Sequence, residues 1–188
     1  MAAGNSLHSV IFVARRLCAA GVFAPLLWSS TIAAEPGVGF PGRVHRIISP
    51  NKQFSIVNRD RDHEPYHELL LTRVSTNASA RIMTYNRHVV VSWSSNSKLL
   101  YVNDYSASDS ADCIVIDPRT LKRISISRTL EHSAYRLLMI DKGHLYITCL
   151  AWKPRDRVVA RIYGYHGEPS RVTDKTALVD GWTGHIVN

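Results

Sequence analysis

Residues 89–126 constrain the fold of this chain more than any other stretch, because they hold four short runs of strand-forming residues separated by turns. The intervening segments are rich in serine, asparagine, aspartate and proline, which favour turns. Strand-forming runs bounded by such residues are typical of β-hairpins. The stretch therefore predicts a four-stranded antiparallel sheet, with strands at residues 89–93, 98–103, 113–117 and 122–126.

The same pattern recurs about 45 residues before and after this stretch. A shift of 45 residues places Ser49 on Ser94 and Asn51 on Asn96, and a further shift places Tyr101 on Tyr146. A fixed period of this length with four strands in each unit is the signature of propeller blades. We therefore expect an all-β fold of antiparallel four-stranded sheets, a partial β-propeller of three blades. The expected units are residues 44–84, 87–128 and 134–173, followed by a C-terminal closing segment.

Two turns of the repeat resemble a known family. The segments 49–52 (SPNK) and 93–98 (WSSNSK) are similar to the W-S-P-D-G-K turn of TolB-type, WD40-like β-propellers, in which that turn opens a hairpin. The resemblance covers residues 44–173 and implies the fold. It does not select a function, because propellers serve binding, structural and enzymatic roles.

The N-terminal residues 1–34 read as a cleaved secretory signal. They contain no acidic residue, a pair of arginines precedes the apolar run 17–28, and Ala33 and Ala34 end the segment. A mitochondrial presequence and a retained anchor are the alternatives. We expect an exported protein, periplasmic or extracellular, with a flexible lead-in at 35–43 and a propeller-like domain at 44–188.

Charge and cysteine content narrow the choice of partners. Removing the leader leaves 154 residues (188 − 34) with 21 basic and 15 acidic side chains, a net charge of about +6. The basic residues are scattered, which indicates a solvated surface and leaves binding to an anionic envelope surface as an alternative. Aromatic residues do not interleave with them as an RNA platform requires, which argues against nucleic acid. Cys113 and Cys149 form either a disulfide or two buried free thiols.

One segment matches a zinc-peptidase motif in form only. His63, Glu64 and His67 follow the H-E-x-x-H order, but that chemistry needs both histidines on one helical face. Pro65 lies between them and disfavours a helix. A small secreted metal-dependent hydrolase using this loop is therefore the alternative function, with His63 and His67 as weak metal candidates. The loop around Asp104 lacks the order of a calcium-binding loop, and we expect a hydrogen-bonded polar loop there.

The leading expectation is a non-catalytic interaction or scaffolding module without a cofactor. Partners would be another protein, or a second copy joined through open sheet edges. The binding face would consist of the two inter-strand loops 59–68 and 104–112, which occupy matching positions in two units. The candidate binding residues are Arg59, Asp60, Arg61, His63, Tyr66, His67, Asp104, Tyr105 and Asp109.

Overall fold

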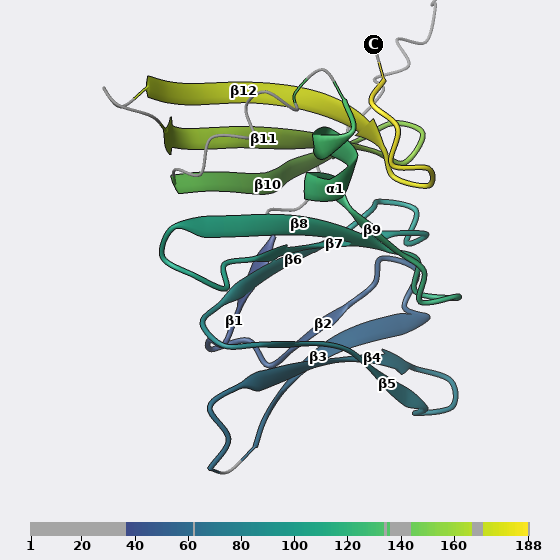
Figure 1. Cartoon of the computed structure of the whole chain (residues 1–188). Helices are drawn as coiled ribbons and strands as arrows, with labels where there is room; N and C mark the ends of the chain where they lie inside the picture. Colours follow the sequence, from purple (N-terminus) through teal and green to yellow (C-terminus); the bar gives the residue numbers. More distant parts are fainter. Residues whose placement is uncertain (1–36, 62, 134, 136–143, 167–170, 188) are drawn as a thin grey trace, which may run out of the picture. The chain divides into compact units, whose positions relative to one another are not determined.

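The computed structural model describes residues 37–187, apart from residues 62, 134, 136–143 and 167–170. The predicted leader at 1–34 lies outside the described residues. The described chain folds into antiparallel β-sheets, which confirms the all-β class (Figure 1).

The first sheet is a four-stranded antiparallel meander in which each strand pairs with the next along the chain. This is the arrangement predicted for the first repeat unit. Its strands are β2 (Arg46–Ile48), β3 (Phe54–Asp60), β4 (His67–Arg73) and β5 (Ser79–Tyr85).

The second sheet follows the same order, and its strands match the predicted runs closely. They are β6 (Val89–Trp93), β7 (Leu100–Asp104), β8 (Ser110–Ile116) and β9 (Arg123–Ser125). A further strand, β1 (Val38–Phe40), pairs antiparallel with β6. The segment expected to be a flexible lead-in is thus partly a strand, and Phe40 is fully buried.

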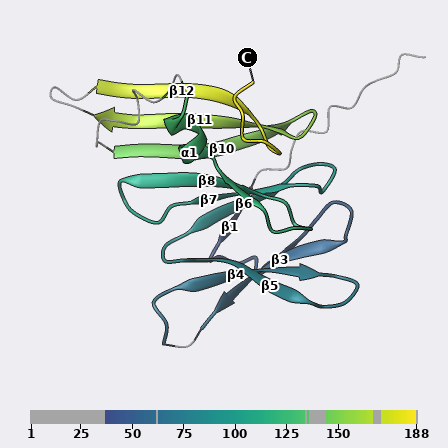
Figure 2. The ribbon, with the colours of Figure 1, turned by 45° about the vertical axis from the view of Figure 1, so that its right-hand side comes forward.

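The third sheet consists of β10 (His144–Lys153), β11 (Arg157–His166) and β12 (Arg171–Asp180), which pair antiparallel. An isolated bridge joins Val179 to Ile186 beyond them. Two parallel residue pairs connect β10 to β8, so the second and third sheets are continuous at that point. Figures 1 and 2 show the strand order β12, β11, β10, β8 in both views.

The third sheet has a different register from the one expected. Because β10 runs parallel to β8, it has the direction of β6 and not that of β7, to which the 45-residue shift assigned it. Trp152 near the end of β10 then corresponds to Trp93 at the end of β6, and a tight hairpin turn follows each. The described strands of the third sheet run from residue 144 to residue 180, past the expected end of the unit at residue 173.

The repeated turns of the first two sheets agree atom by atom. In each, the leading serine hydroxyl accepts the N–H five residues on at 3.0 Å and donates to the asparagine two residues on, at 2.8 and 2.9 Å. Lys52 and Ser97 occupy the same left-handed conformation, with φ of 59° and 60°. The residues concerned are Ser49, Asn51 and Phe54, and Ser94, Asn96 and Leu99. This identity shows that the 45-residue period is structural.

One short helix, α1 (Ile126–Glu131), follows β9. Its N-cap is Ser125, whose hydroxyl accepts the N–H of Arg128 at 3.2 Å. The side chains of Ile126 and Leu130 are fully buried against the sheets. Helix α1, the one helix among the described residues, is too short to cross a membrane.

The second sheet is buried on both faces. Side chains alternate along a strand, so Val102 joins the core shared with the first sheet while Tyr101 joins the core shared with the third sheet and α1. The three sheets therefore stabilise one another through two separate apolar cores. The first core includes Phe54, Ile56, Leu69, Val89, Val91 and Trp93, and the second includes Val115, Leu130, Ile147, Val158 and Ile162.

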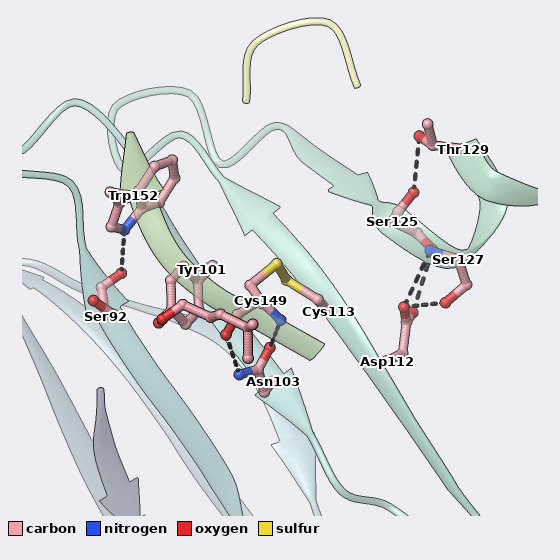
Figure 3. The surroundings of a disulfide bond; sticks show 11 residues. Ser92, Tyr101, Asn103, Asp112, Cys113, Ser125, Ser127, Thr129, Cys149 and Trp152 are labelled. Carbon is pink, nitrogen blue, oxygen red and sulfur yellow. Dashed lines mark hydrogen bonds between the residues drawn. A yellow bond between two sulfur atoms is a disulfide. The ribbon is translucent and has the colours of Figure 1, made fainter. Parts of the chain in front are cut away.

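A disulfide and a buried side-chain amide hold the second and third sheets together (Figure 3). Cys113 on β8 is bonded to Cys149 on β10, and their Cα atoms are 5.8 Å apart. Asn103 donates to the carbonyl of Cys149 at 2.9 Å and accepts its N–H at 2.7 Å. Trp152 on β10 makes another contact with the second sheet, because its indole N–H donates to the carbonyl of Ser92 on β6 at 3.3 Å.

Candidate functional site

The β3–β4 hairpin carries three arginines arranged around one glutamate. Glu68 is the second residue of β4, and Arg59 is its direct cross-strand partner on β3. Arg59 donates its Nε–H to Oε2 of Glu68 at 2.7 Å, and Arg61 and Arg81 each approach Oε1 at 3.1 Å. The Glu68 side chain is fully inaccessible, whereas the arginine side chains are 46–56% exposed. The carboxylate is therefore covered by surface arginines and not by the apolar core.

This arrangement fixes the ionisation of Glu68. The hydrogen bonds from Arg59 are the main cause that lowers the pKa of Glu68 to about 2, against an opposing effect of burial. A carboxylate with three guanidinium partners stays charged through the physiological range. The charged carboxylate of Glu68 holds the three guanidinium groups in place. Each guanidinium has more N–H donors than it gives to Glu68.

A second polar chain lies on the opposite face of the same hairpin. Asp60 pairs with the ring of His67 and accepts from Asn58 at 2.9 Å, and Asn58 accepts the hydroxyl of Tyr85 at 2.6 Å. The hydrogen bond with His67 is the main cause that lowers the pKa of Asp60. Burial is the main cause that raises the pKa of Tyr85. These bonds fix the base of the hairpin.

His63 and Tyr66 lie in the hairpin loop. His63 has a left-handed backbone with φ of 69° and is exposed, and Tyr66 is partly exposed. His67 lies in β4 with its ring on Asp60. The two histidines thus do not share a helical face as zinc peptidases require. The described residues contain no group of three or more metal-ligating side chains.

The β7–β8 hairpin differs from the first in its chemistry. Asp104 and Asp112 are direct cross-strand partners, and Oδ1 of Asp104 is buried without a hydrogen-bond partner among the described residues. Burial, followed by the charge of Asp112, raises the pKa of Asp104. Tyr105 stacks on His88 with ring centroids 4.3 Å apart, and burial raises its pKa. Asp109 contributes its carbonyl to the N–H of Leu145 at 3.1 Å.

Asp112 has a structural role that its sequence position does not show. It accepts hydrogen bonds from the hydroxyls of Ser125 and Ser127 and from the N–H of Ser127, and so fixes the start of α1. Figure 3 shows these contacts beside the disulfide. The polar, hydrogen-bonded loop expected here is thus observed for Asp112 but not for Asp104.

The structure brings the candidates Arg59 and Arg61 together on Glu68 and pairs Asp60 with His67 on the opposite face, but sequence reasoning missed Glu68 and Arg81 as members of the arginine cluster. Glu68 was placed only at the end of the loop, and Arg81 lies on a different strand. The signal available was the strand register, which sets Glu68 opposite Arg59 and places Arg81 on the neighbouring strand. Long-range pairing of this kind depends on a β-bulge at Leu69/Leu70, which the sequence does not reveal.

The described chain has concave surface near α1 and its C-terminal segment. Two adjoining hollows of about 260 and 560 Å³ lie between the end of α1 and the C-terminal segment 183–187. Neither hollow is lined by a residue of the two hairpin ends.

Comparisons with known proteins give no family assignment. No protein-family model matches this chain, and a search of curated proteins finds no match.

Proposed function

We propose that this chain is an exported, non-catalytic interaction module of the β-propeller type, which binds a protein partner through its β3–β4 and β7–β8 hairpin ends. The propeller type is supported by the repeated meanders with matching turns and by the stacking of the sheets through apolar faces. Export is supported by the composition of residues 1–34 and by a buried disulfide, a bond that persists in oxidising compartments.

The observation that carries the proposal is the arginine–glutamate cluster at the first hairpin end. Arginine is enriched among the residues that dominate binding energy at protein interfaces. Here Glu68 restrains three arginines beforehand, so less side-chain entropy is lost when a partner binds. Tyr66, in the loop of the same hairpin, adds an aromatic ring of the kind that such interfaces favour.

Affinity capture with a paired control tests this proposal. Tagged protein would be used to capture partners from an extract of exported proteins, and the double variant His63→Ala/Tyr66→Ala would be compared with wild type. The control, Ser75→Ala/Thr76→Ala, changes exposed residues beyond the opposite end of β4. We expect at least a tenfold loss of the specifically captured partner in the first variant and no loss in the control.

Equal capture by both variants and by wild type would contradict a role for this hairpin end. Thermal melts of all three proteins show whether the fold is preserved. Neither His63 nor Tyr66 contributes to the apolar cores, so their loss should leave the melting temperature within a few degrees of wild type.

The three half-exposed arginines favour one second candidate, the binding of an anionic envelope surface. Binding of that kind weakens steeply as salt screens the charges. Co-sedimentation with anionic vesicles at low and high salt separates the two functions: an anionic-surface binder loses most of its vesicle association at high salt, whereas a protein-binding module shows little association at either concentration.

A further inference from the structure

The first and third sheets each leave one face uncovered by the described residues. On the first sheet this face includes Val44 and Ile48, which are 45% and 53% exposed. On the third sheet it includes Tyr165 and Val172, which are cross-strand partners and are 46% and 84% exposed. Apolar side chains grouped on a sheet face are unusual in water and indicate an interaction surface.

The uncovered face of the first sheet corresponds, residue by residue, to a face that is buried in the second sheet. The 45-residue shift places Val44 on Val89 and Ile48 on Trp93. Val89 is fully buried and Trp93 is 9% exposed, because this face of the second sheet packs on the first sheet. The first sheet thus presents the face with which a unit packs on the preceding unit, but no unit precedes it in the described chain.

The third sheet presents the opposite half of the same contact. Trp152 pairs with Val158 as Trp93 pairs with Leu100, so the third sheet packs on the second through the equivalent face. Its other face corresponds to the one with which a sheet receives the next unit. That face carries two stacked aromatic pairs, His144 with Tyr165 and Tyr146 with Tyr163, whose ring centroids are 4.4 and 5.1 Å apart.

We propose that these two faces bind each other between two copies of the chain. The outer face of the first sheet of one copy docks on the outer face of the third sheet of its partner, and the reverse contact forms at the same time. Two copies related by a twofold axis would then bring six sheets face to face in a closed cycle. Both contacts would repeat the packing that already joins the sheets within each chain. This self-association extends the proposed function and does not use the hairpin loop residues His63 and Tyr66.

The chemistry of the two faces is complementary. The first sheet's face carries Arg46 beside its apolar residues. The third sheet's face presents tyrosine rings and Asp174, which already holds Arg161 at 2.9 Å while Arg161 lies 4.5 Å from the centre of the Tyr163 ring. A tyrosine-rich surface attracts guanidinium groups through its ring faces. A second copy therefore supplies both the apolar and the charged partner.

The mass of the purified full-length protein in solution, measured by light scattering over a range of concentrations, tests this proposal. We expect twice the 21.1 kDa mass of the chain. Ile48→Glu on the first face and Tyr165→Glu on the second should each halve that mass. The control Leu121→Glu changes another exposed apolar residue, 38% exposed, in the turn before β9. It should leave the dimer intact.

Mixing the two variants gives a sharper test. Ile48→Glu keeps an intact third-sheet face and Tyr165→Glu keeps an intact first-sheet face, so the mixture should form a dimer with one of the two contacts. An association through two identical patches would not recover on mixing. A monomer at all concentrations, a dimer that survives in both variants, or a mixture that stays monomeric would overturn the proposal. Unchanged partner capture by His63→Ala/Tyr66→Ala together with an intact dimer would contradict the proposed hairpin function alone and would leave the self-association standing.

Discussion

At the scale of single residues, Glu68 is the most informative side chain in the described chain. A carboxyl whose pKa falls on folding, here from 4.5 to about 2, stabilises the native state above its unfolded pKa. That stabilisation is lost as the pH falls from about 4.5 towards 2. The sign follows from proton binding, because the unfolded chain takes up the proton more readily than the folded one.

We therefore expect Glu68→Gln to lower the melting temperature at pH 7, because the three arginines then lose their common charged partner. The difference from wild type should shrink between pH 4.5 and pH 2, where wild-type Glu68 itself becomes protonated. Thermal melts over this pH range measure the effect. Glu131→Gln on the exposed surface of α1 serves as the control. A difference that does not change with pH would contradict the role assigned to the Glu68 charge.

A second residue-scale prediction concerns the repeated turn. The Ser94 hydroxyl is buried, accepts the N–H of Leu99 and donates within the turn. Ser94→Ala leaves that N–H without its partner and should lower the free energy of unfolding by about 1–3 kcal/mol. Ser49→Ala should cost a similar amount, because Ser49 makes the same bonds in the first sheet. Ser95→Ala, at an exposed position of the same turn, should be neutral in urea unfolding.

At the scale of elements, the sequence predicts what depends on local residues. The turns 49–54 and 94–99 follow from serine and asparagine at fixed spacing, and β6 has the predicted bounds. The 45-residue shift assigns β10 to the position of β7 and not to that of β6, because the spacing between units changes. Trp152 lies 59 residues after Trp93, not 45. Helix α1 lies between β9 and β10 in the chain order. Trp152, which precedes Lys153 and Pro154, is the residue in the sequence that indicates the correct position of β10 in the repeat.

The disulfide belongs to this scale, because it joins two strands of different sheets. It closes a loop of 36 residues, and a loop of that length corresponds to roughly 4 kcal/mol of lost unfolded-state entropy. We expect the double variant Cys113→Ala/Cys149→Ala to unfold at a lower urea concentration, with a free energy of unfolding lower by about 4 kcal/mol. Wild-type protein unfolded in the presence of a reductant should show the same shift. Unchanged midpoints in both experiments would mean that the bond adds nothing to stability.

At the scale of the whole molecule, the sequence could not show which faces are covered. Val44 and Val89 are both valine at equivalent positions, yet one is 45% exposed and the other is fully buried. The difference arises from position in the stack and not from residue type. In the same way, the sequence gives no sign that Asn103 bonds to the backbone of Cys149, because that contact depends on how the third sheet packs on the second.

The stack of sheets makes a prediction about cooperativity. Trp152 packs on Tyr101 with ring centroids 5.6 Å apart and bonds to Ser92, so it links the third sheet to the second. Trp152→Ala should lower the free energy of unfolding by about 3–5 kcal/mol. The first sheet shares its core only with the second sheet. In Trp152→Ala, backbone hydrogen exchange should therefore accelerate much more in β10–β12 than in β3 and β4.

The control for this prediction is Trp182→Ala, which removes the same side chain from a position that is 38% exposed. It should leave exchange in β10–β12 within a few-fold of wild type. Uniform acceleration across all three sheets in Trp152→Ala would mean that the chain unfolds as one unit. Selective opening of the third sheet would instead show that each sheet depends mainly on its neighbour, as expected of a stack of repeats in which each unit contacts only the next.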